Sequence, residues 1–236
     1  MTAPIAVALL GGGDLAGPLA ERTGVTVRST DADDHLDVAH RLGLDAELVV
    51  GLARHPWPIA PDLHAQGSAT LPSYTGVVSW HGLPALLDAL ADAAAPGARA
   101  GAHVLVTAPD PGSDIEPGDV LFLREVAEGI AERIALPARS IAWRGTTRTP
   151  TAVDALTSVV EAHGRTDIVE VPVAPGTGAD ADLLATADRL GARLTCVDLG
   201  RATLLDLLTE VVGTVAGHED LGDELDPDDA IDVGDP

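Results

Sequence analysis

The chain has 236 residues, 46% of them apolar, which is enough for one large domain or two small ones. Its 14 basic residues, all arginine, face 37 acidic ones, and the net charge of −23 argues against nucleic-acid binding, because a phosphate backbone needs a basic surface. The single cysteine, Cys196, excludes a disulfide framework and a multi-cysteine metal site.

No stretch of eighteen apolar residues occurs, and the first residues lack a basic segment ahead of an apolar one, so neither a membrane span nor a secretory signal is expected. We therefore expect a cytoplasmic protein. The absence of lysine has two explanations that stay open. One is a genome rich in G and C, and the other is adaptation to high intracellular salt, in which an acidic surface keeps a protein in solution.

The first part of the chain alternates short apolar runs with helical patterns, as is typical of α/β folds. The predicted strands are Ile5–Leu10, Val25–Ser29, Glu47–Ala53 and Ser68–Leu71. The predicted helices are Leu15–Arg22, Asp33–Leu42 and Leu83–Ala95. Proline and glycine in the stretch Ala95–Ala102 end the last of these helices and indicate a boundary.

A second cycle of the same order follows. Its predicted strands are Val104–Thr107, Ser140–Trp143, Ile168–Val173 and Leu194–Asp198. Its predicted helices are Phe122–Ile134, Thr151–Ala162, Asp182–Leu190 and Thr203–Val212, the last with Gly213 as its stop signal. The fold class is therefore α/β, with two similar three-layer halves, each built on a mostly parallel sheet. The halves comprise residues 1–98 and 99–217, and the acidic residues 218–236 are expected to form a disordered tail.

The glycines after the first predicted strand suggest one kind of site. Gly11, Gly13 and Gly17 lie between a strand and a helix, and Asp31 ends the next strand, which is close to a dinucleotide-binding fingerprint. The spacing differs from that fingerprint by one residue, and parallel sheets commonly have glycines at such turns without a ligand. Both interpretations stay open at this point.

Two histidines suggest another kind of site. His55 and His81 each follow an apolar strand, and each has an indole nearby, from Trp57 and Trp80. Ligands of open α/β sheets gather at that edge, where a neutral imidazole can bind a divalent metal or accept a proton. His64 is a weaker third candidate. The other histidines, which include His35 and His40 on a predicted helix, His103 before a strand and His163 at a helix end, are expected to be ordinary.

The order of these elements and three short motifs resemble one enzyme family. The run Leu9–Gly17 is similar to the opening strand and turn of the sirohydrochlorin chelatases and cobaltochelatases, relatives of ferrochelatase. The run Val104–Ala108 with Gly112–Asp114 is similar to the corresponding turn of their second half, and Val171–Gly176 to a later strand end. In two-halved members each half is an α/β unit, and the tetrapyrrole lies in the cleft between the halves.

The chain departs from this family at its metal ligands. The family's first metal-binding histidine falls at Leu10, which cannot ligate a metal. The second corresponds by topology to His55, or to His81 if the strand that precedes it is Tyr74–Ser79.

The resemblance implies a chelatase-like protein of siroheme or cobalamin biosynthesis that inserts cobalt or ferrous iron into sirohydrochlorin or a related tetrapyrrole. His55 and His81 would be its catalytic and metal-binding residues, and Gly11, Gly12, Gly13 and Gly176 would contact the substrate. The divalent metal would be a substrate, and no organic cofactor is expected. The partner is a small molecule, neither nucleic acid nor membrane, and a homo-oligomer is left open. Two alternatives remain: a non-catalytic member that binds metal or tetrapyrrole, and an NAD(P)-binding oxidoreductase that uses the Gly11–Gly17 turn.

Overall fold

A computed structural model describes residues 5–10, 13–30, 48–53, 74–79, 84–109, 117–135, 139–146, 148–173 and 178–218. The strands are β1 (Ile5–Leu10), β2 (Thr26–Thr30), β3 (Leu48–Ala53), β4 (Tyr74–Ser79), β5 (His103–Pro109), β6 (Arg139–Arg144), β7 (Asp167–Pro172) and β8 (Arg193–Cys196). The helices are α1 (Gly13–Thr23), α4 (Pro84–Arg99), α5 (Pro117–Ile134), α6 (Ala152–Glu161), α7 (Ala181–Arg189) and α8 (Gly200–His218). None of these helices is long and apolar enough to cross a membrane.

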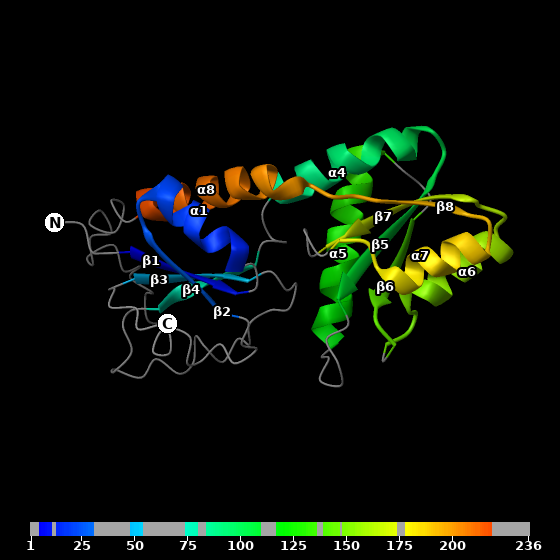
Figure 1. The fold of residues 1–236 in the computed structure, drawn as a ribbon, viewed down its shortest axis with the longest axis horizontal. Coiled ribbons are helices and arrows are strands. Elements are labelled where there is room, and N and C mark those ends of the chain that lie inside the picture. Colours follow the sequence, from blue (N-terminus) through cyan, green and yellow to red (C-terminus); the bar gives the residue numbers. More distant parts are fainter. Residues whose placement is uncertain are drawn as a thin grey trace, which may run out of the picture.

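The strands form two four-stranded sheets with the same topology (Figure 1). The first has the order β2-β1-β3-β4 and the second the order β6-β5-β7-β8, and all their pairings are parallel. The prediction of an α/β fold with two similar parallel-sheet halves is therefore confirmed.

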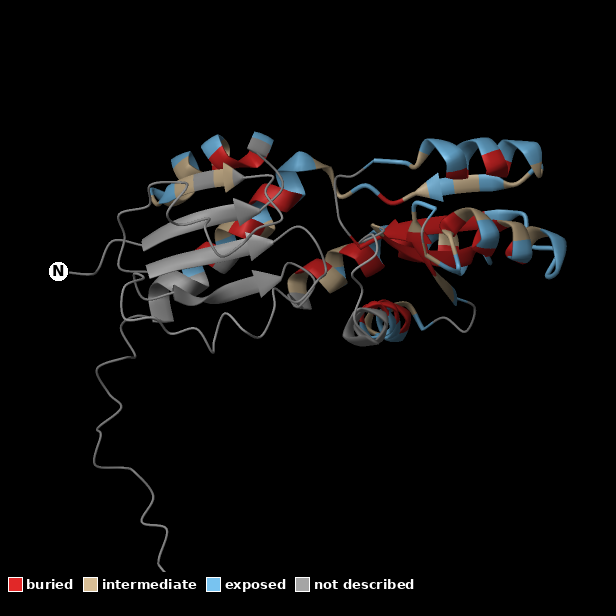
Figure 2. Ribbon diagram, turned by 90° about the horizontal axis from the view of Figure 1, so that it is seen from below, coloured by how far each residue is buried: buried red, intermediate tan, exposed pale blue. Residues whose placement is uncertain are grey.

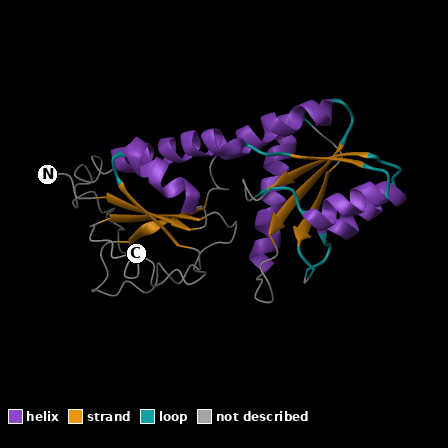
Figure 3. Cartoon of the chain, viewed as in Figure 1, coloured by secondary structure: helices purple, strands orange, loops and turns teal. Residues whose placement is uncertain are grey.

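The second sheet has helices on both faces (Figure 3). Its central strands are buried, at residues 103–108 of β5 and 168–172 of β7. Val106 and Val171 pack with α4 and α5 on one face, whereas Leu105 and Ile168 pack with α6 and α7 on the other. Burial on both faces explains why these strands appear in the sequence as continuous apolar runs instead of alternating ones.

Two helices are exchanged between the halves. α4 follows β4 of the first sheet in the chain, but it packs against α5 and β7 of the second. α8 follows β8 of the second sheet, but it packs against α1 of the first (Figure 1). The halves are therefore linked by packing as well as by the chain, and the predicted boundary after residue 98 stays a prediction.

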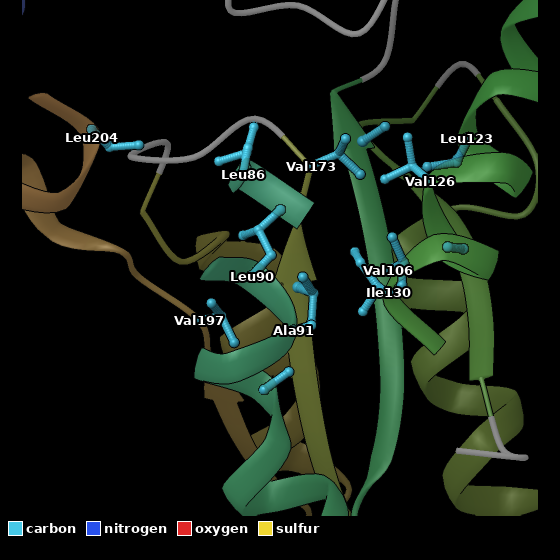
Figure 4. Packing of buried hydrophobic residues seen from close by; sticks show 14 of the residues in the cluster. Leu86, Leu90, Ala91, Val106, Leu123, Val126, Ile130, Val173, Val197 and Leu204 are labelled. Carbon is cyan, nitrogen blue, oxygen red and sulfur yellow. The ribbon is translucent and has the colours of Figure 1, made fainter. Parts of the chain in front are cut away.

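One apolar cluster spans both halves. Leu19 of α1 and Leu208 of α8 belong to it together with Leu90 of α4 and Ile130 of α5. Figure 4 shows part of this cluster, including Leu204 of α8 and Leu86 of α4. Buried residues lie along the inward faces of these helices and across the second sheet (Figure 2). Burial of this continuous apolar surface is the main force that holds the exchanged helices in place.

Two predicted helix ends are wrong. α4 does not end at Ala95 but continues through Pro96 to Arg99. α8 does not stop at Gly213 but continues to His218. In α4 the packing of Ala98, which is 3% exposed, outweighs the backbone hydrogen bond that proline cannot donate.

The fourth strand of the first sheet lies at Tyr74–Ser79, the position that the chelatase resemblance needs if His81 is its second histidine. The predicted strand Ser68–Leu71, the predicted helix Asp33–Leu42 and residues 219–236 of the predicted tail lie outside the described residues, whereas His218, the first residue of that tail, is the last residue of α8.

Candidate functional site

The strand order places a topological switch point in each sheet. β1 lies between β2 and β3, and β5 lies between β6 and β7, so the chain leaves β1 and β3, and likewise β5 and β7, in opposite directions. Ligands of open α/β sheets bind beyond the carboxyl ends of the strands at such points. The strands of the first sheet point toward the second half (Figure 2), and those of the second sheet point toward the first (Figure 3). The carboxyl ends of both sheets therefore form the candidate site.

The predicted site residues follow these strand ends in the chain. Gly11 and Gly12 come directly after β1, Gly13 is the first residue of α1, and Gly176 comes four residues after β7. His55 comes two residues after β3, and His81 two residues after β4. Apart from Gly13, all of them lie outside the described residues, and their roles stay predictions.

β3 and β4 are neighbours in the first sheet. Their last residues, Ala53 and Ser79, are register partners. The two histidines therefore come at equal distances along the chain from one pair of adjacent backbone positions.

A buried polar cluster lies near the carboxyl ends of the second sheet. Glu170 of β7 is fully buried, and its Oε1 accepts a hydrogen bond of 2.8 Å from Oγ1 of Thr107 in β5. Nε and Nη2 of Arg144, the last residue of β6, are also 2.8 Å from that oxygen. Arg144 donates a further hydrogen bond of 2.8 Å to the carbonyl of Gly178, before α7. The cluster therefore bridges the two switch-point strands and ties the chain ahead of α7 to β6.

Cys196, the last residue of β8, completes this cluster. Burial raises the pKa of its thiol to about 11, with further contributions from the charge of Glu170 and a hydrogen bond to that carboxylate. The thiol is therefore protonated at neutral pH, and it is no nucleophile there. Within the described residues, Oε2 of Glu170 accepts no hydrogen bond, so the carboxylate retains capacity for one more donor.

Neither Glu170 nor Arg144 is among the predicted site residues, although the sequence contains a signal for both. Glu170 is the one charged residue within the apolar run of residues 168–173, and Arg144 follows the apolar end of another strand. A charge inside a strand that is buried on both faces needs a partner of opposite charge. Glu170 therefore indicates a nearby cation, and Arg144 is a candidate for it. Which strands would bring them together depends on the strand order.

The dinucleotide alternative receives no support from α1. The third glycine of that fingerprint lets the helix pack closely on the strand, but Gly17 is exposed, and a Cβ atom there would meet no atom within 4 Å. The strand order also differs from the dinucleotide-binding order, in which β2 lies between β1 and β3.

No metal centre is found in the described part of the chain, where no three His, Cys, Asp or Glu side chains are grouped. His55 and His81 lie outside that part, so this finding does not test the metal site predicted at these two histidines.

Comparisons with known proteins support the fold. No family profile and no curated protein matches the sequence. The solved structure of CbiX, the terminal enzyme for biosynthesis of siroheme in denitrifying bacteria, is similar over 89% of this chain and 98% of its own, with a TM-score of 0.59 and 15% identity. A periplasmic solute-binding protein of an ABC transporter from Actinobacillus succinogenes 130z, solved with bound D-allose, is similar over 91% of this chain and 90% of its own, with a TM-score of 0.51 and 12% identity. At these identities the similarity shows a chelatase-like α/β fold.

Proposed function

We propose that this protein is a chelatase that inserts cobalt or ferrous iron into sirohydrochlorin or a related tetrapyrrole. The observation that carries the proposal is the register pair Ala53 and Ser79 at the ends of β3 and β4, because His55 and His81 each come two residues later. The similarity to CbiX over nearly its full length supports the same function.

Chain geometry would allow these two histidines to reach one ion. Neighbouring strands lie about 4.8 Å apart, and two residues span at most about 7 Å. The imidazoles of His55 and His81 can therefore converge beyond β3 and β4 on the side that faces the second half. Neutral imidazole nitrogen is a good ligand for divalent cobalt and iron.

Metal insertion needs little other chemistry. The divalent ion replaces two pyrrole protons, so the site must deliver the ion and accept two protons as the metal–nitrogen bonds form. One histidine of the pair would deliver the ion and the other would accept a proton. The backbone at Gly11, Gly12, Gly13 and Gly176 would lie against the macrocycle, and arginines would pair with its carboxylates. The metal is a substrate, and the reaction needs no organic cofactor.

The test is an insertion assay with sirohydrochlorin and Co²⁺ or Fe²⁺, followed by absorbance. The native protein is expected to exceed the spontaneous rate, and His55→Ala and His81→Ala are each expected to lose about 10²-fold or more of that activity. His40→Ala, which changes a histidine with no assigned role, is the matched control and should keep the native rate. Native rates in both site variants would contradict the histidine assignment.

Leu10 favours a second candidate, a binding protein of the same fold. It is the last residue of β1 at the switch point, where the chelatase family has a metal-binding histidine. In this case, sirohydrochlorin would bind with saturation in a fluorescence titration, while metal insertion would proceed only at the spontaneous rate. Acceleration of insertion by the native protein would exclude this candidate.

A further inference from the structure

A surface groove of about 760 Å³ runs along α6 and the edge strand β6, and its volume is within the range of small-molecule sites. His103 and Arg139, which line it, are the first residues of β5 and β6, so the groove opens at the amino ends of the second sheet. The candidate chelatase site lies at the carboxyl ends, and the groove is separate from it. The lining residues are His103, Arg139, Ser140, Ile141, Pro150, Asp154, Ala155, Ser158, Val159, His163 and Arg165.

The charge of this groove is opposite to that of the protein as a whole. Acidic residues outnumber basic ones by 37 to 14 in the chain, yet the groove contains two arginines and two histidines against one carboxylate, Asp154. Two hydroxyl groups, from Ser140 and Ser158, add hydrogen-bond donors. A concentration of guanidinium groups and hydroxyls in a concave surface is the chemistry that recognises oxyanions.

Both guanidinium groups can accept a new partner. Arg165 is exposed and lines the groove, so its guanidinium is accessible to a ligand. Arg139 is paired with Glu128 at 3.5 Å, and both side chains are partly exposed, so this pair is weak. An anion in the groove can therefore bind to Arg139 and Arg165 without breaking a buried interaction.

His103 forms the floor of the groove and is affected by this positive charge. His103 is buried, and its Nε2 lies 3.0 Å from Oγ of Ser140. Burial lowers the pKa of His103, and the positive charges of Arg165 and His163 lower it further. The guanidinium of Arg165, which lines the same groove, therefore contributes positive potential at the groove floor, where an anion would be stabilised.

We propose that this groove binds a small organic oxyanion, a phosphate ester or a dicarboxylate, through Arg139 and Arg165. The hydroxyls of Ser140 and Ser158 donate further hydrogen bonds to the anion. Ile141, Ala155 and Val159 form an apolar wall for the carbon skeleton. Asp154, near the beginning of α6, accepts from a hydroxyl or amine of the ligand.

The experiment is calorimetric titration of the full chain with three probes: inorganic phosphate, phenyl phosphate and malonate. We expect saturable binding of phenyl phosphate or malonate. The probe that binds more tightly shows whether the groove prefers a phosphate ester or a dicarboxylate. Inorganic phosphate should bind more weakly than phenyl phosphate, because it has no group for the apolar wall.

Matched arginine variants separate the groove from general charge effects. Arg165→Ala is expected to weaken binding at least tenfold, and Arg139→Ala to weaken it as well. Arg189→Ala removes the same charge from an exposed position on α7, outside the groove, and should leave binding unchanged. The proposal is overturned if no probe binds with saturation, or if Arg189→Ala weakens binding as much as Arg165→Ala does.

Discussion

The guanidinium of Arg201 donates a hydrogen bond of 2.6 Å to the backbone carbonyl of Asp14, 187 positions earlier in the chain. This bond joins the first turn of α8 to the first turn of α1, and Arg22 and Asp206 form an ion pair between the same helices. Beneath these polar contacts, Leu15 and Leu19 of α1 share the apolar cluster with residues of α8. The first half therefore depends on a helix from the end of the chain.

The packing between α1 and α8 should contribute more to stability than their ion pair. Leu19 is fully buried, so Leu19→Ala is expected to lower the free energy of unfolding by about 2–5 kcal/mol. The Arg22–Asp206 pair is exposed, and Arg22→Ala should cost less than about 1 kcal/mol. Urea denaturation of both variants measures the two values, and equal losses would contradict this account.

Gly97 should be intolerant of any side chain. A Cβ atom there would lie 2.3 Å from Cγ2 of Val169, a buried residue of β7, so Gly97→Ala is expected to destabilise the protein by about 1–3 kcal/mol. Gly213 is the control, because it is an exposed glycine of α8 whose Cβ would meet no atom within 4 Å. Gly213→Ala should stabilise the protein by about 0.5–1 kcal/mol. Thermal melting distinguishes the opposite signs.

The Arg144–Glu170 pair should behave as a unit. Arg144→Met leaves a fully buried carboxylate without its counter-ion and is expected to cost about 3–5 kcal/mol. Adding Glu170→Leu to this variant removes the unpaired charge and should restore much of the lost stability. A double-mutant cycle in denaturant tests this coupling, and losses that simply add would show that the two side chains act independently.

Glu170 should also control the reactivity of Cys196. Its negative charge and hydrogen bond help to raise the pKa of the thiol to about 11, so Glu170→Gln is expected to lower that pKa toward its ordinary value. Alkylation at pH 9 should then be faster, because more of the thiol is ionised. Asp182→Asn, on the exposed side of α7, should leave the alkylation rate unchanged. A rate in Glu170→Gln equal to that of the native protein would refute this role.

The buried His103 should make stability depend on pH. Because its pKa is lowered in the folded state, the unfolded state binds more protons below the ordinary value of 6.5, and stability falls as the pH decreases through this range. The titratable groups around it in the groove are Arg139, Asp154, His163 and Arg165. The stability of the native protein relative to His103→Gln should be constant above pH 7.5 and decrease as the solution is acidified to pH 5. A relative stability that rises on acidification would contradict the lowered pKa.

The amino-acid sequence determined most of the secondary structure. The strand predicted at Ile5–Leu10 matches β1 residue for residue, because a short continuous apolar run that ends at glycines is typical of a parallel strand. The helix predicted at Thr151–Ala162 matches α6 with its two caps, since the Thr151 hydroxyl accepts a hydrogen bond from the backbone of Asp154. Such signals are local, so they determine the helix or strand independently of the elements that pack against it.

The tertiary structure alone decided what these elements pack against. An amphipathic face shows that a helix is buried, but not against which sheet, so the exchange of α4 and α8 is absent from the pattern of either helix. For the same reason the groove could not be predicted from the sequence. His103 begins β5, Arg139 begins β6, and His163 and Arg165 lie between α6 and β7, so its charged residues come from three segments with ordinary sequences. Parallel pairing of β5 with β6, and the return of the chain through α6, bring these side chains to one surface.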